Sequence, residues 1–308
     1  MQRERSASRV VAPLEPRGGR LRGGVHVMQN PSRASGLGPA LTCNTMTRPS
    51  VEPWLASAAL ERVGEFATQL RTVGDTSVRV PNLDWTVADL AQHVASLPSH
   101  FGRLQDDAAG FVRPTDWAAF ADERRAHITE TDAAKLADFI DTELSTYVQL
   151  LTESERRWLY GSEFDTTILM GLFLDELIIH GMDLAGATGA DAPVFEENEA
   201  NAAAEAAVIT TPLFIDPVKA AAQPDGVYHL KFRGGRHFTW TKTGNGLVTT
   251  EGKPAKADAH LNTDPAMFML SSLGRVSQVR AALSGKMVSY GRKPWRFIGL
   301  GGMVFDGI

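Results

Sequence analysis

Histidine and glutamate side chains can bind metal ions or carry protons, and three of them lie on predicted apolar helices of this 308-residue chain: His93, Glu176 and His180. Glu176 and His180 are four residues apart, so on a helix they leave the same face one turn apart. The segment 168–179 around Glu176 is apolar on nearly every side, which predicts a buried helix. A buried carboxylate needs a counter-charge, which is a metal ion, a protonated histidine or an arginine.

His93 belongs to a different predicted helix, which begins at Thr86. Leu90 lies three residues before it and Leu97 four residues after it, so His93 is on the apolar stripe and faces the core. Taken alone, this pattern is typical of a neutral imidazole bonded to a carbonyl group. Asp89 stands three residues after Thr86 and fits a capping box at the helix start.

Long helices must bring these residues together. Apolar residues at helical spacing predict helices near 54–70, 86–97, 133–152, 165–185 and 196–209, which suggests a bundle. Gly186 and Gly189 signal the end of the fourth helix. At Gly226 the period becomes that of strands. We predict strands at 226–232, 237–243, 247–252 and 257–263, helices at 265–273 and 276–284, and a last strand at 286–291.

Two stretches resemble the mycothiol-dependent maleylpyruvate isomerase family, within the DinB-like helical-bundle superfamily. They are "VPNLDWTVADLAQHVASL", with the family's tryptophan, threonine and histidine, and "LFLDELIIHGMDLAGATG", with its Glu-x-x-x-His followed by Gly-x-Asp-Leu. The bundle resemblance covers roughly residues 50–220. It implies that His93, Glu176 and His180 are metal ligands. It also implies zinc as the metal and mycothiol as the thiol cofactor.

Two imidazoles and one carboxylate suit Zn²⁺ with an open fourth position, and they also suit Fe²⁺ or another divalent metal. Asp183, one turn after His180, is a candidate to accept the imidazole N–H, or it is simply a charge at the helix end. His100 is a weaker ligand candidate, because Pro98 is expected to end the helix before it. Three further histidines lie on predicted strands or their edges and are expected to be surface or packing residues: His229, His237 and His260.

Residues 226–308 resemble the small α+β domain of sterol carrier proteins, on the basis of element order and glycines. Several apolar residues of this segment either line a tunnel for a hydrophobic ligand or, as is more common, form ordinary core: Met267, Phe268, Met269, Leu270, Met303 and Phe305. Four arginines are candidates to bind a substrate carboxylate, and nothing in the sequence selects among them: Arg275, Arg280, Arg292 and Arg296.

Composition limits the other possibilities. Hydrophobic residues make up 43% and charged residues 22% of the chain, and the net charge is −5. Residues 1–50 contain eight arginines, no lysine and two glutamates, so the remainder carries −11, which argues against a nucleic-acid surface. No apolar run is long enough for a membrane span. Cys43 is the single cysteine, so no internal disulfide forms, and we expect a cytoplasmic protein.

The expected organisation has three parts. Residues 1–45 form a disordered tail rich in Arg, Gly, Ser and Pro, and Met46 is an alternative start. Residues 46–216 form the DinB-like four-helix bundle. A linker from Pro217 to Asp225 leads to the sterol-carrier-like domain at 226–308.

The expected function is a zinc-dependent enzyme that adds metal-bound mycothiol thiolate to a small electrophile. It acts as an isomerase, which turns a cis double bond to trans by reversible addition, or as an S-transferase. Asp175 or Asp183 as a base would instead permit hydrolysis. The alternative is a non-catalytic carrier of a lipid or another hydrophobic metabolite in the C-terminal domain.

Overall fold

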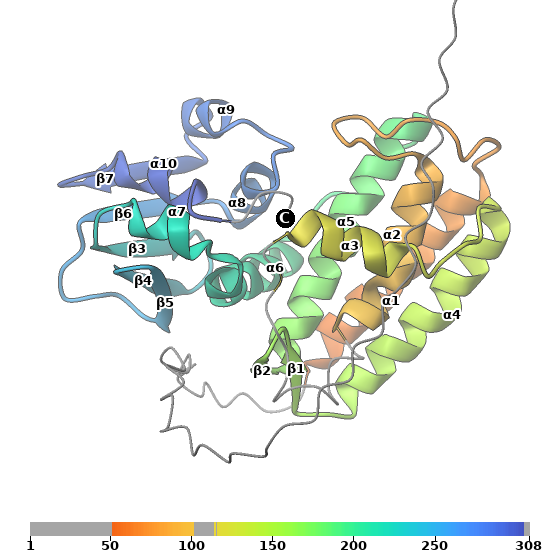
Figure 1. The fold of residues 1–308 in the computed structure, drawn as a ribbon, viewed down its shortest axis with the longest axis horizontal. Helices are drawn as coiled ribbons and strands as arrows, with labels where there is room; N and C mark the ends of the chain where they lie inside the picture. Colours follow the sequence, from red (N-terminus) through yellow and green to blue (C-terminus); the bar gives the residue numbers. More distant parts are fainter. Residues whose placement is uncertain (1–50, 102–113, 115, 305–308) are drawn as a thin grey trace, which may run out of the picture. The chain divides into compact units, whose positions relative to one another are not determined.

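The computed structural model describes residues 51–101, 114 and 116–304. The predicted tail at 1–45 lies outside these residues. Four long helices form the first part of the described chain (Figure 1): α1 (Pro53–Arg71), α2 (Val87–Phe101), α4 (Ala133–Thr152) and α5 (Thr166–Thr188). Helices α1 and α2 each pack on both α4 and α5, which makes a four-helix bundle.

Apolar residues at helical spacing build the interior of this bundle. In α1 every third or fourth residue is buried, for example Leu55, Ala59, Val63 and Phe66. The start of α2 is a capping box, as predicted. The Asp89 carboxylate accepts a hydrogen bond from the Thr86 backbone N–H at 2.9 Å, and the Thr86 hydroxyl accepts one from the Asp89 N–H at 3.2 Å.

Helix α5 is buried along most of its length. It begins after Asp165, whose side chain accepts the Thr167 N–H, and it ends at Gly189, whose φ of 74° suits glycine. Gly186, predicted as an end signal, lies inside the helix. Gly171 faces α6 so closely that a Cβ there would lie 2.7 Å from the Ala202 carbonyl oxygen.

Among the described residues, no helix is both long enough and apolar enough to cross a membrane.

Two bundle elements were not predicted. Helix α3 (Trp117–Arg125) follows α2, and a short hairpin of β1 (Arg156–Leu159) and β2 (Ser162–Asp165) precedes α5. The hairpin turn has Tyr160 at φ 49° and Gly161 at φ 77°, which are the left-handed conformations of a two-residue primed turn. The Tyr160 ring is buried against Trp117, 4.8 Å between ring centroids, and against Phe214.

The chain then leads from the bundle to a sheet. After α6 (Glu197–Thr210) and the 3₁₀ turn η2 (Thr211–Phe214), the predicted linker begins with a short helix, α7 (Pro217–Ala221). This helix was missed because it is one turn long. Asp216 caps it by accepting the Val218 N–H. The Asp216 N–H in turn donates to the Met303 carbonyl near the end of the described chain.

The C-terminal part is a five-stranded sheet with helices, so the predicted fold class, a helical bundle followed by a small α+β domain, is confirmed. The strands are β3 (Gly226–Phe232), β4 (His237–Thr243), β5 (Gly246–Glu251), β6 (Ala259–Thr263) and β7 (Met287–Gly291), in the spatial order β5-β4-β3-β6-β7. Strands β3 and β6 are parallel, and the other pairs are antiparallel. The helices are α8 (Pro265–Ser272), α9 (Gln278–Leu283) and the unpredicted α10 (Arg296–Gly301).

One face of this sheet contributes to the core. Tyr228, Leu230 and Phe232 alternate along β3 and are all buried, and Phe268 of α8 packs on Phe232 with 5.3 Å between ring centroids. The same helix α8 also packs on α6. The sheet domain therefore contacts the helical part directly.

Candidate metal centre

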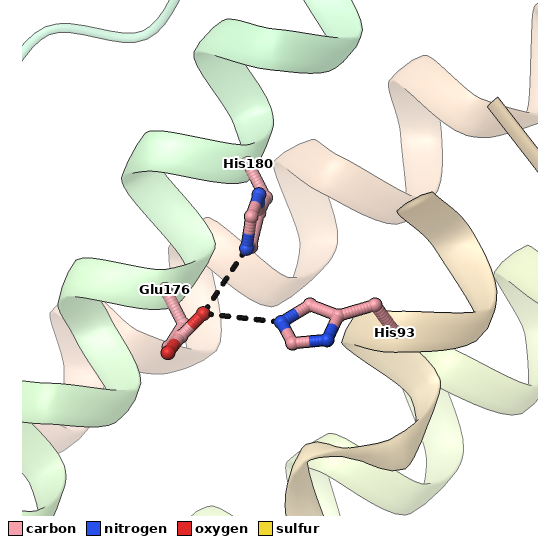
Figure 2. A group of neighbouring side chains, drawn as sticks. All are labelled: His93, Glu176 and His180. Carbon is pink, nitrogen blue, oxygen red and sulfur yellow. Dashed lines mark hydrogen bonds and ion pairs between the residues drawn. The ribbon is translucent and has the colours of Figure 1, made fainter. Parts of the chain in front are cut away.

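The structure brings His93, Glu176 and His180 together, as Figure 2 shows. One carboxylate oxygen of Glu176, Oε2, lies 3.1 Å from Nε2 of His180 and 3.4 Å from Nε2 of His93. One nitrogen or oxygen from each of the three residues lies within 4.8 Å of the others. Two nitrogens and one oxygen thus converge on one point, although 83 residues separate His93 from Glu176.

Two helices position these side chains. Glu176 and His180 occupy successive turns of α5, while His93 comes from α2, which packs on α5. The α2 stripe predicted around His93 is indeed buried, since Leu90, Val94 and Leu97 are fully inaccessible. Rigid, buried helices hold the three donors, which favours a fixed geometry over an adaptable one.

The donor set fits a divalent metal ion. Metal–nitrogen and metal–oxygen bonds of about 2.0–2.2 Å place neighbouring ligand atoms roughly 3–4 Å apart. The separations of 3.1 and 3.4 Å from the carboxylate oxygen agree with this requirement. In the described part of the chain, Glu176 has no arginine or lysine as ion-pair partner, only the two histidines.

Protonation of the site follows from its burial and its charges. Burial alone would raise the pKa of Glu176, but hydrogen bonds with His180 and His93 outweigh burial and hold that pKa below its usual range. Burial opposes the charge of His180, yet Asp183 and Glu176 raise its pKa to about 9. Burial dominates at His93 and lowers its pKa. Without a metal, a proton on His180 therefore supplies the cation that Glu176 needs.

Asp183 contacts the other nitrogen of His180. Its Oδ2 lies 3.1 Å from His180 Nδ1, and its side chain is only 6% exposed. Arg275, from the sheet domain, donates to both carboxylate oxygens of Asp183. These contacts lower the pKa of Asp183 against the opposing effect of its burial.

Trp85 and Arg125 border the site, and neither was assigned a role from the sequence. The Trp85 ring lies 5.0 Å from the His93 ring and 6.1 Å from the His180 ring, measured between centroids. The Arg125 guanidinium lies over Trp85 and pairs with Asp89 at 3.2 Å. Trp85 is the tryptophan of the stretch that resembles the family. Its position beside both imidazoles is visible only in the folded bundle.

Glu176 is the most exposed of the three candidate ligands. Its side chain is 31% exposed, whereas those of His93 and His180 are 11% and 10% exposed. The bundle therefore encloses the two imidazoles more than the carboxylate.

One protein-family model matches the helical part of the chain. Residues 56–185, from α1 to near the end of α5, match the family model described as the mycothiol maleylpyruvate isomerase N-terminal domain. This segment is therefore similar to that domain. All three candidate ligands lie within it, and so do Trp85 and Asp183. The comparison with curated proteins finds no match.

Solved structures that align with most of this chain include a mycothiol-dependent maleylpyruvate isomerase. The crystal structure of the mycothiol-dependent maleylpyruvate isomerase aligns over 77% of this chain and 91% of its own, with 15% identity and a TM-score of 0.44. A histidine-to-alanine mutant of that isomerase aligns over the same shares, with 16% identity and a TM-score of 0.46. The sec-alkylsulfatase Pisa1 from Pseudomonas sp. aligns over 81% of this chain and 33% of its own, with 12% identity and a TM-score of 0.31.

Two expectations about α2 and α5 differ from what the structure shows. Helix α2 continues through Pro98 to Phe101, so Pro98 does not end it before His100 as expected, and the His100 side chain lies outside the described residues. Asp175 is buried, and burial raises its pKa well above the usual value. Burial therefore disfavours the charged form of Asp175 that a base requires. Asp183 is already engaged by His180 and Arg275.

Three other histidines form a group in the sheet domain: His229, His237 and His260. His229 is buried, with Nδ1 3.0 Å from His260 and Nε2 2.9 Å from His237. Its two nitrogens point to different neighbours, so the three imidazoles make a hydrogen-bonded row on the sheet and satisfy one another. This agrees with the packing role expected for them.

The remaining sequence candidates lie in the sheet domain. Arg292 pairs with Asp258 at 3.0 Å, Arg296 donates to the Asp225 carbonyl, and Arg280 is exposed on α9. Among the proposed tunnel residues, three belong to the hydrophobic core: Phe268, Met269 and Met303. Met267 and Leu270 are partly exposed, and Phe305 lies outside the described residues.

Proposed function

We propose that this chain is a metal-dependent enzyme that uses mycothiol, adding its thiolate to an electrophilic small molecule. The observation that carries the proposal is the convergence of His93, Glu176 and His180 within a mycothiol maleylpyruvate isomerase N-terminal domain. Three protein ligands with one open position are typical of a catalytic rather than a structural metal site.

Zinc is the proposed metal, with Fe²⁺ as the alternative for the same donors. Once bound, a divalent ion would lower the pKa of a coordinated thiol, so that a nucleophilic thiolate exists at neutral pH. Residues 51–308 contain no cysteine, so the sulfur nucleophile has to be external to this part of the chain.

The residues of the chain would prepare the site in three ways. Asp183 accepts the Nδ1–H of His180, which leaves the Nε2 lone pair directed at the metal position. Trp85 lies against both imidazoles and excludes water from that side. Glu176, the most exposed of the three candidate ligands, contributes one negative charge to the site.

Two outcomes of thiolate addition are compatible with this site. If the adduct rotates about the former double bond and expels the thiol, a cis alkene becomes trans and the thiol is regenerated. If the new carbon–sulfur bond persists, the reaction is an S-transfer. We propose isomerase or S-transferase activity and leave the electrophile to be identified by assay.

Cobalt substitution tests the central step. Cobalt-loaded protein should develop an intense near-ultraviolet sulfur-to-cobalt band when mycothiol is added. His93→Ala should abolish the band, because one of the three ligands is lost. His127→Ala is the matched control, since His127 is exposed at the end of α3 and away from the cluster.

Two results would contradict the proposal. One is a metal that takes up no thiol in a protein that hydrolyses esters or amides. The other is purified protein with an empty bundle site and a co-purified lipid, which would favour a hydrophobic carrier instead.

A further inference from the structure

A chain of polar contacts runs from the sheet domain to one proposed metal ligand. Arg275 lies in the connection between α8 and α9, 92 residues after Asp183. Its Nε donates to Asp183 Oδ1 at 3.1 Å and its Nη2 to Oδ2 at 2.5 Å. Asp183 Oδ2 also contacts His180 Nδ1 at 3.1 Å. The Arg275 guanidinium therefore contacts the Asp183 carboxylate, which in turn contacts the His180 imidazole.

The arginine is itself held in place. Its third nitrogen, Nη1, donates to the Leu273 carbonyl at 2.6 Å, and its backbone N–H donates to the Leu270 carbonyl at the end of α8. Gly274, with φ 74°, makes this tight return of the chain possible. The Arg275 side chain is only 20% exposed. A side chain fixed by its own turn can orient its partner.

We propose that Arg275 is a positioning residue for the metal centre: it fixes Asp183, and Asp183 fixes His180. The sheet domain thereby contributes to the affinity of a site whose ligands all belong to the bundle. This inference rests on the proposed function, because it assumes that His180 is a ligand.

The physical reason is the orientation of two planar groups. A bidentate arginine–carboxylate pair restricts rotation of the carboxylate, which a single contact with His180 would not do. With Oδ2 held beside Nδ1, the imidazole keeps its proton there and presents Nε2 to the site. Loss of such a supporting partner typically lowers metal affinity about tenfold to a hundredfold.

Removing the arginine would also leave Asp183 with one partner in a buried position. A carboxylate that is 6% exposed and has lost its arginine tends to turn toward water. This rotation weakens its hydrogen bond with His180. An arginine that merely fastens two domains together would influence stability alone, and this difference makes the proposal testable.

The test measures binding of Zn²⁺ and Co²⁺ alone to metal-free full-length protein, by competition with a chromophoric chelator. Arg275→Met should lower the affinity about tenfold to a hundredfold. Arg275→Lys should restore part of it, because lysine keeps the charge but not the two parallel hydrogen bonds. Arg292→Met is the matched control, an exposed arginine of the same domain paired with Asp258, and should bind as wild type does.

A double-mutant cycle tests the route through Asp183. In an Asp183→Asn background, Arg275→Met should change the affinity less than about threefold, because the link is already broken. The ¹⁵N spectrum of His180 supplies a readout that a purely structural role would not move. In the metal-bound state Nδ1 carries the proton in both proteins, and its ¹⁵N chemical shift should indicate a weaker hydrogen bond to Asp183 in Arg275→Met than in the wild type.

Each result decides a different point. If wild-type protein binds metal and Arg275→Met binds it equally well, with or without a lower melting temperature, Arg275 only fastens the domains and the inference is wrong. If wild-type protein itself binds neither ion, the proposed function fails and takes this inference with it. Fully additive effects in the double-mutant cycle would also overturn the route through Asp183.

Discussion

His180 Nε2 lies 3.1 Å from Glu176 Oε2, one turn away on the same helix, where a proton and the proposed metal would compete for the same nitrogen. Because the pKa of His180 is raised to about 9, a metal has to displace one proton at neutral pH. The lowered pKa values of Glu176 and His93 mean that neither contributes a second proton there. Metal affinity should therefore rise about tenfold per pH unit up to about pH 9.

Calorimetric titrations with Co²⁺ in buffers of different ionisation enthalpy would count the protons released. We expect one proton per ion at pH 7. A count near zero would show that His180 is already neutral, and a count of two would show that His93 is charged as well.

The same proton should stabilise the metal-free fold. Since the folded pKa of His180 exceeds its ordinary value of 6.5, its contribution is fully present below pH 6.5 and is lost as pH rises through about 9. Melting temperatures of metal-free protein should fall over this window. His180→Gln should flatten the profile, and an unchanged slope in that variant would assign the effect to another group.

His229 should produce the opposite dependence in the sheet domain. Burial, followed by the nearby charges of His237 and His260, lowers its pKa to about 4. Its contribution to stability is therefore fully present above pH 6.5 and is lost as pH falls through about 4. Chemical unfolding between pH 7.5 and 4 should show this loss, and His229→Phe should reduce it. If His229→Phe follows the wild-type profile, the imidazole row plays no part in acid sensitivity.

Gly171 should not tolerate even a methyl group. A Cβ there would lie 2.7 Å from the Ala202 carbonyl oxygen and 2.9 Å from the Ala206 Cβ, so α5 and α6 would have to separate. Gly171→Ala should lower the free energy of unfolding by about 1–3 kcal/mol.

Gly64→Ala is the matched control, in a helix with nothing within 4 Å of the new methyl group. It should raise stability by about 0.5–1 kcal/mol, because alanine favours a helix more than glycine does. Denaturant unfolding followed by far-ultraviolet circular dichroism measures both. Equal effects of the two substitutions would rule out close α5–α6 packing.

Tyr160 combines an unfavourable backbone conformation with a buried ring. Tyr160→Gly relieves strain of about 1 kcal/mol but removes an aromatic core group worth about 3–5 kcal/mol. We expect a net loss of roughly 2–4 kcal/mol by the same estimates. Asn82 is exposed and has a φ of 64°, so Asn82→Gly should change the free energy of unfolding by only a few tenths of a kcal/mol. Stabilisation by Tyr160→Gly would mean that the ring contributes little to the bundle.

The sequence predicted the elements that have a long apolar face. The four bundle helices and the five strands were found because their burial repeats every 3.6 or every two residues. Helix α3 was missed because only Trp117 among its nine residues is buried, so its pattern is weak. The β1–β2 hairpin was missed because Tyr160 is an unusual residue for a turn that requires positive φ.

The candidate site was accessible to sequence reasoning only in part. The four-residue spacing of Glu176 and His180 is local, so it can be read from one helix. The partnership with His93, 83 residues away, came from the family resemblance rather than from any periodicity. Neither the residue spacing nor the family resemblance predicted that Arg275 pairs with Asp183. The sequence does not distinguish Arg275 from the three other candidate arginines of the sheet domain.

The charges gathered at Glu176 and Asp183 have a consequence for the molecule that completes the site. Each carboxylate carries one negative charge, Arg275 carries one positive charge, and burial favours the neutral form of Asp175. With neutral imidazoles, these groups total one negative charge, which a divalent ion would convert into one positive charge. Net charge is unfavourable where His93 and His180 are each only 8% exposed. Electroneutrality then selects a monoanion as the fourth ligand, such as a thiolate, over a neutral molecule or a dianion.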